Sequence, residues 1–212
     1  MNLPHRHDSA LDDELILQDL PSGEPWSGKI AFLDRDGVLN RWSENYINTP
    51  DELLLLPDAA KSVGMLKRAG FRICVVTNQS PIGRGIWGHD VLKSIHRKLQ
   101  ELLAGEDPDA IIDLILYSPY SPEDESWARK PNPGMLEVGR QLLDAAHNSE
   151  SHGIRLLLGP KWLDRPDEGS SFMVGDQQSD IFAAKRYGVR GIRCDTEVGL
   201  GGVITQILEI QE

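Results

Sequence analysis

A short apolar run that ends in two aspartates constrains this chain more than any other stretch. Residues 30–33 read Ile-Ala-Phe-Leu, and Asp34, Asp36 and Gly37 follow at once. An uninterrupted apolar run of this length is typical of a strand that is buried on both faces of a parallel sheet. Open α/β sheets bind their ligands at the carboxyl ends of such strands. The two carboxylates are therefore predicted to lie in a ligand site, although an aspartate pair taken alone would also fit a solvated turn.

Apolar runs and amphipathic segments alternate along the rest of the chain. Each apolar run has the length of a strand, and the segments between the runs carry apolar residues at helical spacing. Strands joined through helices form right-handed βαβ units in a parallel sheet that helices cover on both faces. We therefore predict an α/β fold with a Rossmann-like, doubly wound parallel sheet. The predicted strands are residues 30–33, 71–76, 111–117, 171–174 and 189–193, and the predicted helices are residues 57–70, 89–103, 133–146 (with Asn132 as its cap), 181–187 and 203–210.

The chain is long enough for one such domain with some additions. Its 212 residues can bury a core of the size that an α/β domain needs. Residues 1–28 show little periodicity and are predicted to form an N-terminal arm, either disordered or draped over the domain. Residues 29–212 are predicted to form the domain itself. Within it, residues 148–170 are expected to be an inserted excursion, and residues 41–56 a flap over the end of the first strand.

Charge and composition exclude several classes of partner. The formal net charge is −11, and basic residues occur in runs no longer than a pair, so neither nucleic acid nor an anionic membrane surface is expected as a partner. No apolar run approaches the length that spans a membrane. The two cysteines, Cys74 and Cys194, are predicted to be free thiols in a reducing compartment. We expect a cytoplasmic protein that acts as a monomer.

Polar side chains follow several predicted strands, at the edge where parallel strands end together. Acidic groups that converge there would repel one another unless a cation lay among them, and oxygen ligands suit Mg²⁺. A lysine and a hydroxyl beside such a metal provide what a phosphate group needs, and a carboxylate can be the nucleophile of phosphoryl transfer. The residues concerned are the carboxylates Asp34, Asp36, Asp176 and Asp180, the hydroxyl and amide of Thr77 and Asn78, and the cation Lys130.

Four motifs, in this order, resemble those of the haloacid dehalogenase (HAD) superfamily of phosphatases. With the additional G-R-G at residues 83–85, they are similar to the histidinol-phosphatase and D-glycero-D-manno-heptose-1,7-bisphosphate 7-phosphatase branch. The resemblance implies a HAD-type fold with a minimal cap and a phosphatase that depends on Mg²⁺. The motifs are D-R-D-G at residues 34–37, T-N-Q-S at 77–80, R-K-P-x-P-G-M at 129–135 and G-D-x-x-x-D at 175–180.

The resemblance assigns the chemistry to the two aspartates of the first motif. Asp34 would be the nucleophile that takes the phosphoryl group. Asp36 would protonate the leaving alcohol as a general acid and would then activate the water that breaks the aspartyl-phosphate. Thr77 and Lys130 would hold the phosphoryl group during its transfer.

The resemblance also implies the metal and substrate contacts. Mg²⁺ would bind the carboxylates of Asp34 and Asp176 and the backbone carbonyl of Asp36, with Asp180 in support. A purely structural role stays open for Asp180, which would also suit the first turn of a helix. The same alternative stays open for the three residues that would lie near the substrate, which are Asn78, Arg84 and Arg129.

The loop before the R-K-P motif departs from the pattern of this branch. Its members commonly hold zinc there through cysteine and histidine, whereas this chain has Ser118, Tyr120, Ser126 and Ala128 at the corresponding places. Hydroxyl groups do not replace thiolate or imidazole in a structural zinc site. No structural zinc is therefore expected, and activity should depend on Mg²⁺ alone.

The expected substrate is a small phosphorylated metabolite, and heptose 1,7-bisphosphate is the leading candidate. Histidinol phosphate or another small sugar or polyol phosphate is the alternative. The net charge of −11 disfavours a phosphatase of nucleic-acid ends. A non-catalytic scaffold is disfavoured because all four motifs are complete.

Overall fold

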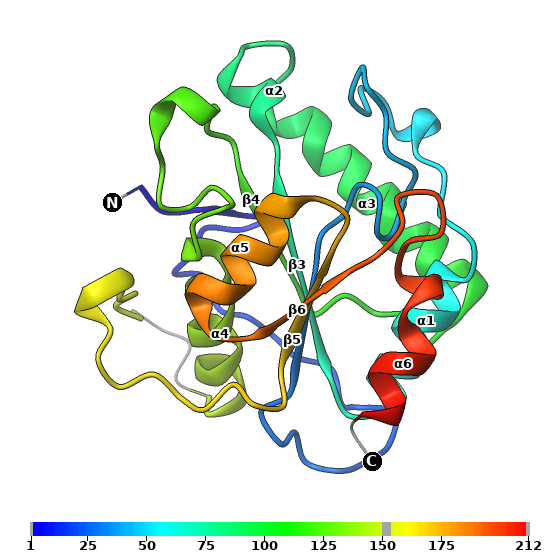
Figure 1. Cartoon of the computed structure of the whole chain (residues 1–212), viewed down its shortest axis with the longest axis vertical. Helices are drawn as coiled ribbons and strands as arrows, with labels where there is room; N and C mark the ends of the chain where they lie inside the picture. Colours follow the sequence, from blue (N-terminus) through cyan, green and yellow to red (C-terminus); the bar gives the residue numbers. More distant parts are fainter. Residues whose placement is uncertain (1, 150–153, 211–212) are drawn as a thin grey trace.

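A six-stranded sheet runs through the middle of the computed structural model, which describes residues 2–149 and 154–210 (Figure 1). The strand order is β1-β4-β3-β2-β5-β6, and every neighbouring pair except β1 and β4 is parallel. The strands are β1 (His5–Arg6), β2 (Ile30–Leu33), β3 (Arg72–Asn78), β4 (Leu114–Ser118), β5 (Phe172–Gly175) and β6 (Arg190–Arg193).

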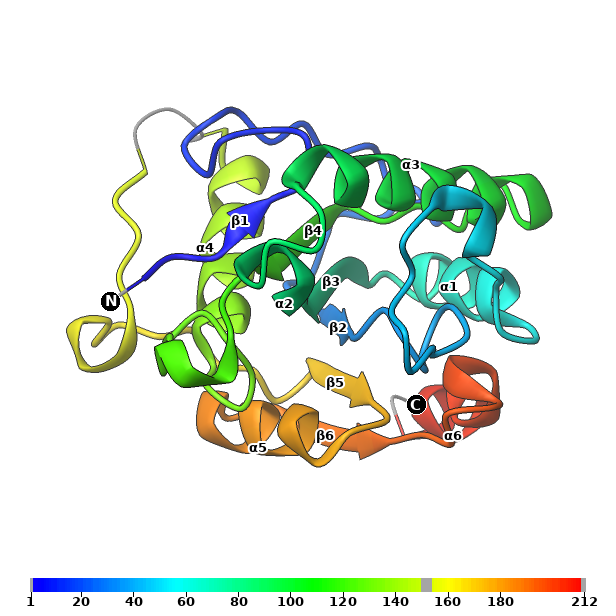
Figure 2. The ribbon, with the colours of Figure 1, turned by 90° about the horizontal axis from the view of Figure 1, so that it is seen from above.

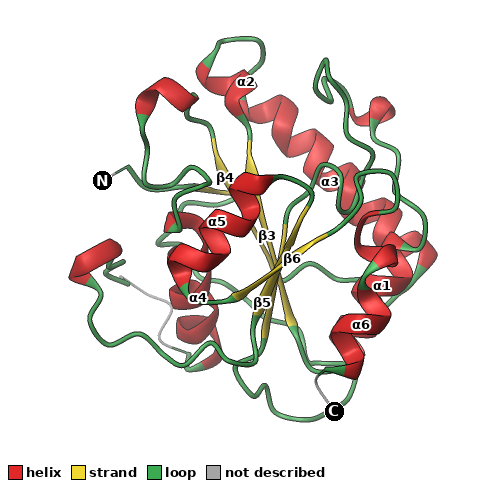
Figure 3. Cartoon of the chain, viewed as in Figure 1, coloured by secondary structure: helices red, strands yellow, loops and turns green. Residues whose placement is uncertain are grey.

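Helices cover both faces of this sheet, as Figures 2 and 3 show. One face carries α1 (Ala59–Arg68), α3 (His89–Glu106) and α6 (Ile204–Glu209), and the other carries α4 (Gly134–His147) and α5 (Gln178–Tyr187). The short helix α2 (Ser80–Gly83) directly follows β3. Four 3₁₀ turns lie at Pro50–Glu52, Pro122–Asp124, Gly159–Lys161 and Gly199–Gly202.

The central strand β2 explains why the sheet needs helices on both sides. Its four residues are all fully buried. Because successive side chains of a strand point to opposite faces, Ala31 and Leu33 join the core beneath α1, α3 and α6, while Ile30 and Phe32 join the core beneath α4 and α5. The predicted α/β fold with a doubly wound, mostly parallel sheet is therefore confirmed. Among the described residues, no helix is both long and apolar enough to cross a lipid bilayer.

The N-terminal segment adds a strand that the sequence did not reveal. His5 pairs with Tyr117 and Arg6 with Leu116, so β1 extends the sheet by one antiparallel edge strand. A strand of two residues is too short to show the alternation on which strand prediction rests. Further along the segment, Leu15, Leu20 and Trp26 are buried in the core beside α4.

The start of α4 differs from the prediction that Asn132 would cap this helix. The helix begins at Gly134, and the side-chain amide of Asn132 makes other contacts. Its Nδ2 donates a hydrogen bond to the Ser126 carbonyl at 3.1 Å, and its Oδ1 accepts one from Arg186 at 2.7 Å. An asparagine cap contributes only about 1 kcal/mol, and here the tertiary contacts outweigh it.

Residues 154–170 of the predicted excursion pack against α4 and α5. Leu158 and Trp162 are buried, and the Trp162 ring stacks on Tyr187 with 6.4 Å between ring centroids. Arg165 forms an ion pair with the buried Glu137 of α4. The segment therefore contributes to the core on this side of the sheet.

Candidate active site

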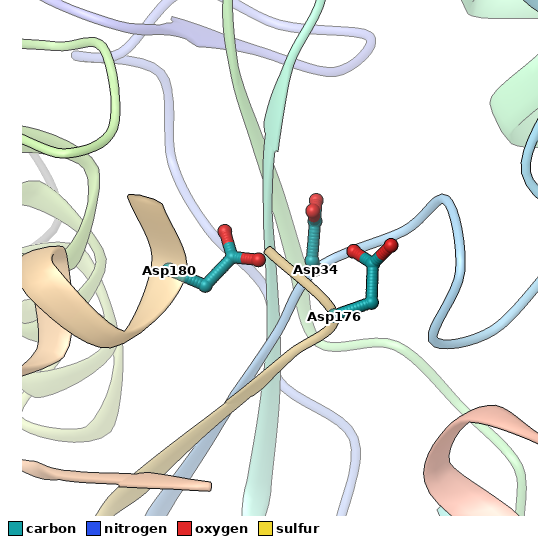
Figure 4. Close-up of side chains that lie close together, drawn as sticks. All are labelled: Asp34, Asp176 and Asp180. Carbon is teal, nitrogen blue, oxygen red and sulfur yellow. The ribbon is translucent and has the colours of Figure 1, made fainter. Parts of the chain in front are cut away.

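Three carboxylates come together where β2 and β5 end. Leu33 is in register with Val174, so the residues that follow, Asp34 after β2 and Asp176 after β5, emerge side by side. Asp180 reaches the same place from the first turn of α5 (Figure 4). One carboxylate oxygen from each lies within 4.8 Å of the others. The adjacent cavity, of about 230 Å³, is lined by seven of the predicted site residues: Asp34, Asp36, Thr77, Asn78, Arg129, Lys130 and Asp176.

The oxygens of Asp176 show that this cluster fits a divalent cation. Its Oδ2 accepts hydrogen bonds from Gln177 Nε2 at 2.7 Å and Thr196 Oγ1 at 3.1 Å. Its Oδ1 is also buried, yet none of the residues described in the structure donates a hydrogen bond to it. A buried carboxylate oxygen left in this way, next to a second carboxylate, suits a hard cation such as Mg²⁺.

Gly37 is required by the close approach of its backbone to Asp176. It has a φ of +75°, which other residues rarely adopt. A Cβ at this position would also lie 2.6 Å from the carboxyl carbon of Asp176. A larger residue at position 37 would therefore displace the Asp176 carboxylate from the cluster.

Lys130 is the cation that the structure itself places in the cluster. Its Nζ is 2.8 Å from Asp34 Oδ1 and 2.7 Å from Asp180 Oδ1, and only 3% of the residue is exposed. Burial works to lower the pKa of Lys130, but Asp180 and Asp34 outweigh it and raise this pKa above its ordinary value. Lys130 therefore stays charged in the position where it meets both carboxylates.

The carboxyl group of Asp34 has a pKa close to neutral pH. Burial raises its pKa to about 7, against the opposing effect of Lys130, and the nearby charge of Asp180 adds to the rise. A divalent cation beside Asp34 would favour its ionised form, as Lys130 does. Ionised Asp34 is the form that a nucleophilic role requires.

The contacts of Asp180 favour a supporting role over direct coordination of a cation. One carboxylate oxygen pairs with Lys130, and the other accepts a hydrogen bond from the Gln177 backbone at 2.9 Å, at the start of α5. Asp180 is fully buried. It thus connects the helix to Lys130 and holds the lysine against Asp34.

Three donors orient the carboxylate of Asp36. The buried Arg35 donates to both carboxylate oxygens at 2.8–3.2 Å, Asn40 Nδ2 donates at 2.9 Å and Gln79 Nε2 donates at 3.2 Å. Gln79 Nε2 also donates to Thr77 Oγ1 at 2.8 Å. Gln79 therefore links the residue predicted as general acid to the hydroxyl predicted to bind phosphate.

Sequence reasoning assigned no role to four residues that the site uses. Arg35, Asn40 and Gln79 lie inside or beside the recognised motifs, so their position was a signal that could have found them. Thr196 lies outside all motifs and reaches Asp176 only through the fold.

Asn78 acts on the backbone that carries Lys130. Its Oδ1 accepts a hydrogen bond from the Lys130 amide, and its Nδ2 donates one to the Lys130 carbonyl, both at 3.1 Å. This reciprocal pair fixes the end of β3 to the R-K-P motif. Asn78 also lines the cavity, so a direct contact with substrate stays a prediction.

The cationic rim consists of two guanidinium groups, Arg129 in the cavity lining and Arg84 just outside it. Arg129 lines the cavity and donates to the Tyr120 carbonyl at 2.9 Å, while Arg84 donates to the hydroxyl of Tyr46 at 2.8 Å. Tyr46 and Trp42, from the predicted flap, line the cavity as well. Burial lowers the pKa of Arg129, and the nearby charge of Arg84 lowers it further. The charges of the two arginines therefore act on each other, and Arg84 reaches the cavity through its contact with Tyr46.

The fold and this site together define a hydrolase of the HAD-like class. A family model described as HAD-hydrolase-like matches residues 127–201. The D-glycero-beta-D-manno-heptose-1,7-bisphosphate 7-phosphatase of Pseudomonas aeruginosa is 34% identical over 174 residues, which cover 82% of this chain and 85% of that protein. The D-glycero-D-manno-heptose-1,7-bisphosphate 7-phosphatase of Thermosynechococcus vestitus is 33% identical, with 80% of each chain covered. The chain belongs to the D-glycero-D-manno-heptose-1,7-bisphosphate 7-phosphatase family of HAD-like hydrolases.

Solved structures of similar proteins agree with this assignment. The D,D-heptose 1,7-bisphosphate phosphatase from B. bronchiseptica, complexed with magnesium and phosphate, superposes with a TM-score of 0.63 and is 26% identical in sequence. The similarity covers 86% of this chain and 99% of that one. A HAD-like phosphatase structure from Mesorhizobium loti, also 26% identical, has a TM-score of 0.61 and covers 94% of this chain and 91% of its own.

The loop before the R-K-P motif is held by direct contacts of its aromatic residues. Tyr120 Oη donates to the Leu3 carbonyl at 3.0 Å, and Trp127 Nε1 donates to Glu137 at 2.7 Å. Ser121 and Asp124 cap the 3₁₀ turn between them reciprocally. These contacts offer the loop a means of keeping its shape in the absence of thiolate or imidazole ligands.

We expect purified protein to contain no stoichiometric zinc, because the loop offers hydroxyls and carboxylates in place of soft ligands. A zinc-selective chelator should leave the thermal melting curve unchanged. EDTA should abolish turnover, and Mg²⁺ alone should restore it. Elemental analysis that finds one tightly bound zinc per chain would contradict this prediction.

Proposed function

We propose that this protein removes the 7-phosphate of D-glycero-D-manno-heptose 1,7-bisphosphate in a reaction that depends on Mg²⁺. The observation that carries the proposal is the presence of two separate cationic positions, one inside the carboxylate cluster and one at the rim. Lys130 occupies the first, and Arg84 and Arg129 form the second. A substrate with one phosphate to transfer and another to bind matches both positions.

The proposed chemistry uses the two aspartates after β2 in succession. The carboxylate of Asp34 attacks the phosphorus atom, and the leaving sugar alcohol takes its proton from Asp36. Asp36 then takes a proton from a water molecule, which attacks the aspartyl-phosphate and releases inorganic phosphate. Lys130 and Thr77 bind the oxygens of the phosphoryl group as its charge is redistributed.

Mg²⁺ would be held by the carboxylates of Asp34 and Asp176 and by the backbone carbonyl of Asp36. Support comes from the buried Oδ1 of Asp176 and from the magnesium and phosphate in the related B. bronchiseptica structure. When bound, the metal neutralises charge on the phosphoryl oxygens and on the nucleophile. Asp180 and Gly37 would support the metal site indirectly. Asp180 holds Lys130, and Gly37 leaves room for the Asp176 carboxylate.

Removing a rim cation tests the second phosphate position. We expect Arg84→Ala and Arg129→Ala each to lower kcat/KM for heptose 1,7-bisphosphate by roughly 10- to 100-fold, the size of a lost charge-assisted hydrogen bond. The ratio of kcat/KM for the bisphosphate to kcat/KM for an aryl phosphate should fall by the same factor. Steady-state kinetics on both substrates measures this.

The matched control is Arg190→Ala, which removes an exposed arginine from the first residue of β6, at the end of the sheet away from the site. Arg190→Ala should leave kcat/KM for both substrates unchanged. Equal kcat/KM for the bisphosphate and for heptose 7-phosphate in the parent protein would contradict a second phosphate position. It would favour a monophosphate substrate, such as another sugar or polyol phosphate.

We further propose that the protein works in the cytoplasm and without nucleic-acid partners. Cys74 and Cys194 are both buried free thiols, which is the state that a reducing compartment maintains. The net charge of −11 supports a small, anionic substrate bound by a few local cations rather than by a broad basic surface.

A further inference from the structure

We propose that the N-terminal segment formed by residues 2–7 positions the cationic rim of the active site. The inference rests on the proposed function, because it concerns how Arg84 and Arg129 are held ready for the second phosphate. It connects the amino end of the chain to these cations through two consecutive residues of the loop after β4.

The first step of the connection runs from the N-terminal segment to Tyr120. The Tyr120 hydroxyl donates a hydrogen bond to the Leu3 carbonyl at 3.0 Å. The His5 ring meets the Tyr120 ring edge-on, with 6.4 Å between centroids, and Pro4 between these contacts is buried. Figure 1 shows the N-terminal segment running beside this loop on its way to β4. Tyr120 is thus fixed on its side-chain end by the segment.

The second step runs from the loop to both cations. The Tyr120 carbonyl accepts a hydrogen bond from Arg129 Nη1 at 2.9 Å. The preceding carbonyl, of Pro119, accepts one from the Gly83 amide at 3.0 Å, at the end of α2. A Cβ on Gly83 would lie 2.5 Å from this carbonyl oxygen, so the two backbones are in tight contact. Arg84 follows directly. A shift of residues 119–120 would therefore disturb the Arg129 guanidinium and the backbone that carries Arg84.

The N-terminal segment can act as a support because it is itself anchored to the sheet and to α3. His5 pairs with Tyr117 in the sheet, and its ring stacks on His89 with 4.9 Å between centroids. Just after the segment, Asp8 forms ion pairs with Lys93 and Arg97 of α3. The segment is thus held between the helix and the loop.

Holding the two arginines in place before substrate arrives has a definite consequence for binding. A free arginine side chain loses much rotational freedom when it grips a phosphate, and a carbonyl that already fixes its direction reduces that loss. The segment should therefore matter for affinity toward the bisphosphate. It should not matter for the transfer step, which belongs to the carboxylate cluster and Lys130.

Two variants test the connection, one by removing a single hydrogen bond and the other by removing the whole segment. Tyr120→Phe keeps the ring and removes the hydroxyl that binds Leu3, and deletion of residues 2–7 removes the whole support. The matched control is Tyr187→Phe, which removes the hydroxyl bound to Glu168 and changes neither residues 2–7 nor the loop after β4. Each protein is assayed with heptose 1,7-bisphosphate and with p-nitrophenyl phosphate. Amide hydrogen exchange is followed at residues 118–129.

We expect KM for the bisphosphate to rise roughly 2- to 10-fold in Tyr120→Phe, the size of one lost hydrogen bond, and further in the deletion variant. The kcat values for both substrates should stay within about two-fold, since one hydrogen bond remote from the transfer step is changed. Exchange at residues 118–129 should accelerate in both variants and stay unchanged in Tyr187→Phe.

If Tyr120→Phe leaves both the amide exchange and KM unchanged, the proposal is overturned. This test remains decisive even if the deletion variant does not fold. An equal loss of kcat on both substrates would also overturn it, since that pattern means general damage to the site. If the full chain does not hydrolyse the bisphosphate, the proposed function fails. The exchange at residues 118–129 then still decides whether the segment holds the loop.

Discussion

Asp34→Asn should abolish both turnover and the formation of a phosphorylated enzyme. The amide keeps the size of the side chain but removes the nucleophilic carboxylate and one of the charges that would hold the cation. It also removes one of the two negative partners of Lys130, the one at 2.8 Å. Rapid quenching with a radiolabelled aryl phosphate, followed by counting of acid-precipitated protein, measures the intermediate directly.

Asp36→Asn should give a different result, because this residue is proposed to transfer protons and not to bond to phosphorus. Its turnover is expected to fall by roughly 10²- to 10⁴-fold, the usual contribution of a general acid and base. The phosphorylated enzyme should still form with an activated aryl phosphate, whose leaving group needs little protonation. It should then decay slowly, since activation of water also depends on Asp36.

The matched control for both variants is Asp164→Asn, a change of an exposed aspartate in the excursion. It should leave the rate and the intermediate unaltered. Near-normal turnover by Asp34→Asn would overturn the assignment of the nucleophile. Loss of the intermediate in Asp36→Asn with an activated substrate would mean that the two aspartates do not have separate roles.

The second large effect is expected on stability, from Glu168→Ala. Glu168 accepts hydrogen bonds from Arg140 Nε at 2.7 Å, from Arg140 Nη2 and from the Tyr187 hydroxyl, all in the buried region between α4 and α5. Its removal leaves a buried guanidinium without its main counter-charge. We expect the free energy of unfolding to fall by about 3 kcal/mol, at the lower end for such a loss, because Asp144 still pairs with Arg140 at 3.1 Å.

Urea denaturation measures this loss, and two variants act as its controls. Glu24→Ala removes an exposed glutamate and should change stability by less than about 0.5 kcal/mol. Glu168→Gln keeps the shape of the side chain and should be intermediate. A Glu168→Ala protein as stable as the parent would show that residues 154–170 are only a surface decoration. The kcat of the folded variant should be retained, since the pair lies outside the cavity lining.

Much of the candidate site was predictable because it depends on local patterns. An apolar run such as residues 30–33 must be a buried strand, and in a parallel sheet the residues after such strands meet at one edge. This reasoning placed Asp34, Thr77, Lys130 and Asp176 together, and all four line the same cavity. The class of fold followed from the same alternation of strands and helices.

Other features were decided only by contacts between segments far apart in the chain. Thr196 reaches Asp176 across 20 residues, and Tyr120 reaches Leu3 across 117, so no local period or motif could reveal either pair. The two-residue strand β1 is too short to carry a pattern of its own and exists because the edge of β4 offers it partners. Asn132 shows the reverse case, in which a local preference for a helix cap lost to hydrogen bonds with Ser126 and Arg186. Strand ends and motifs are local, so the side chains proposed for the chemistry could be selected along the chain. What orients them followed from the fold, because hydrogen bonds and ion pairs depend on distance in space and not on separation along the chain.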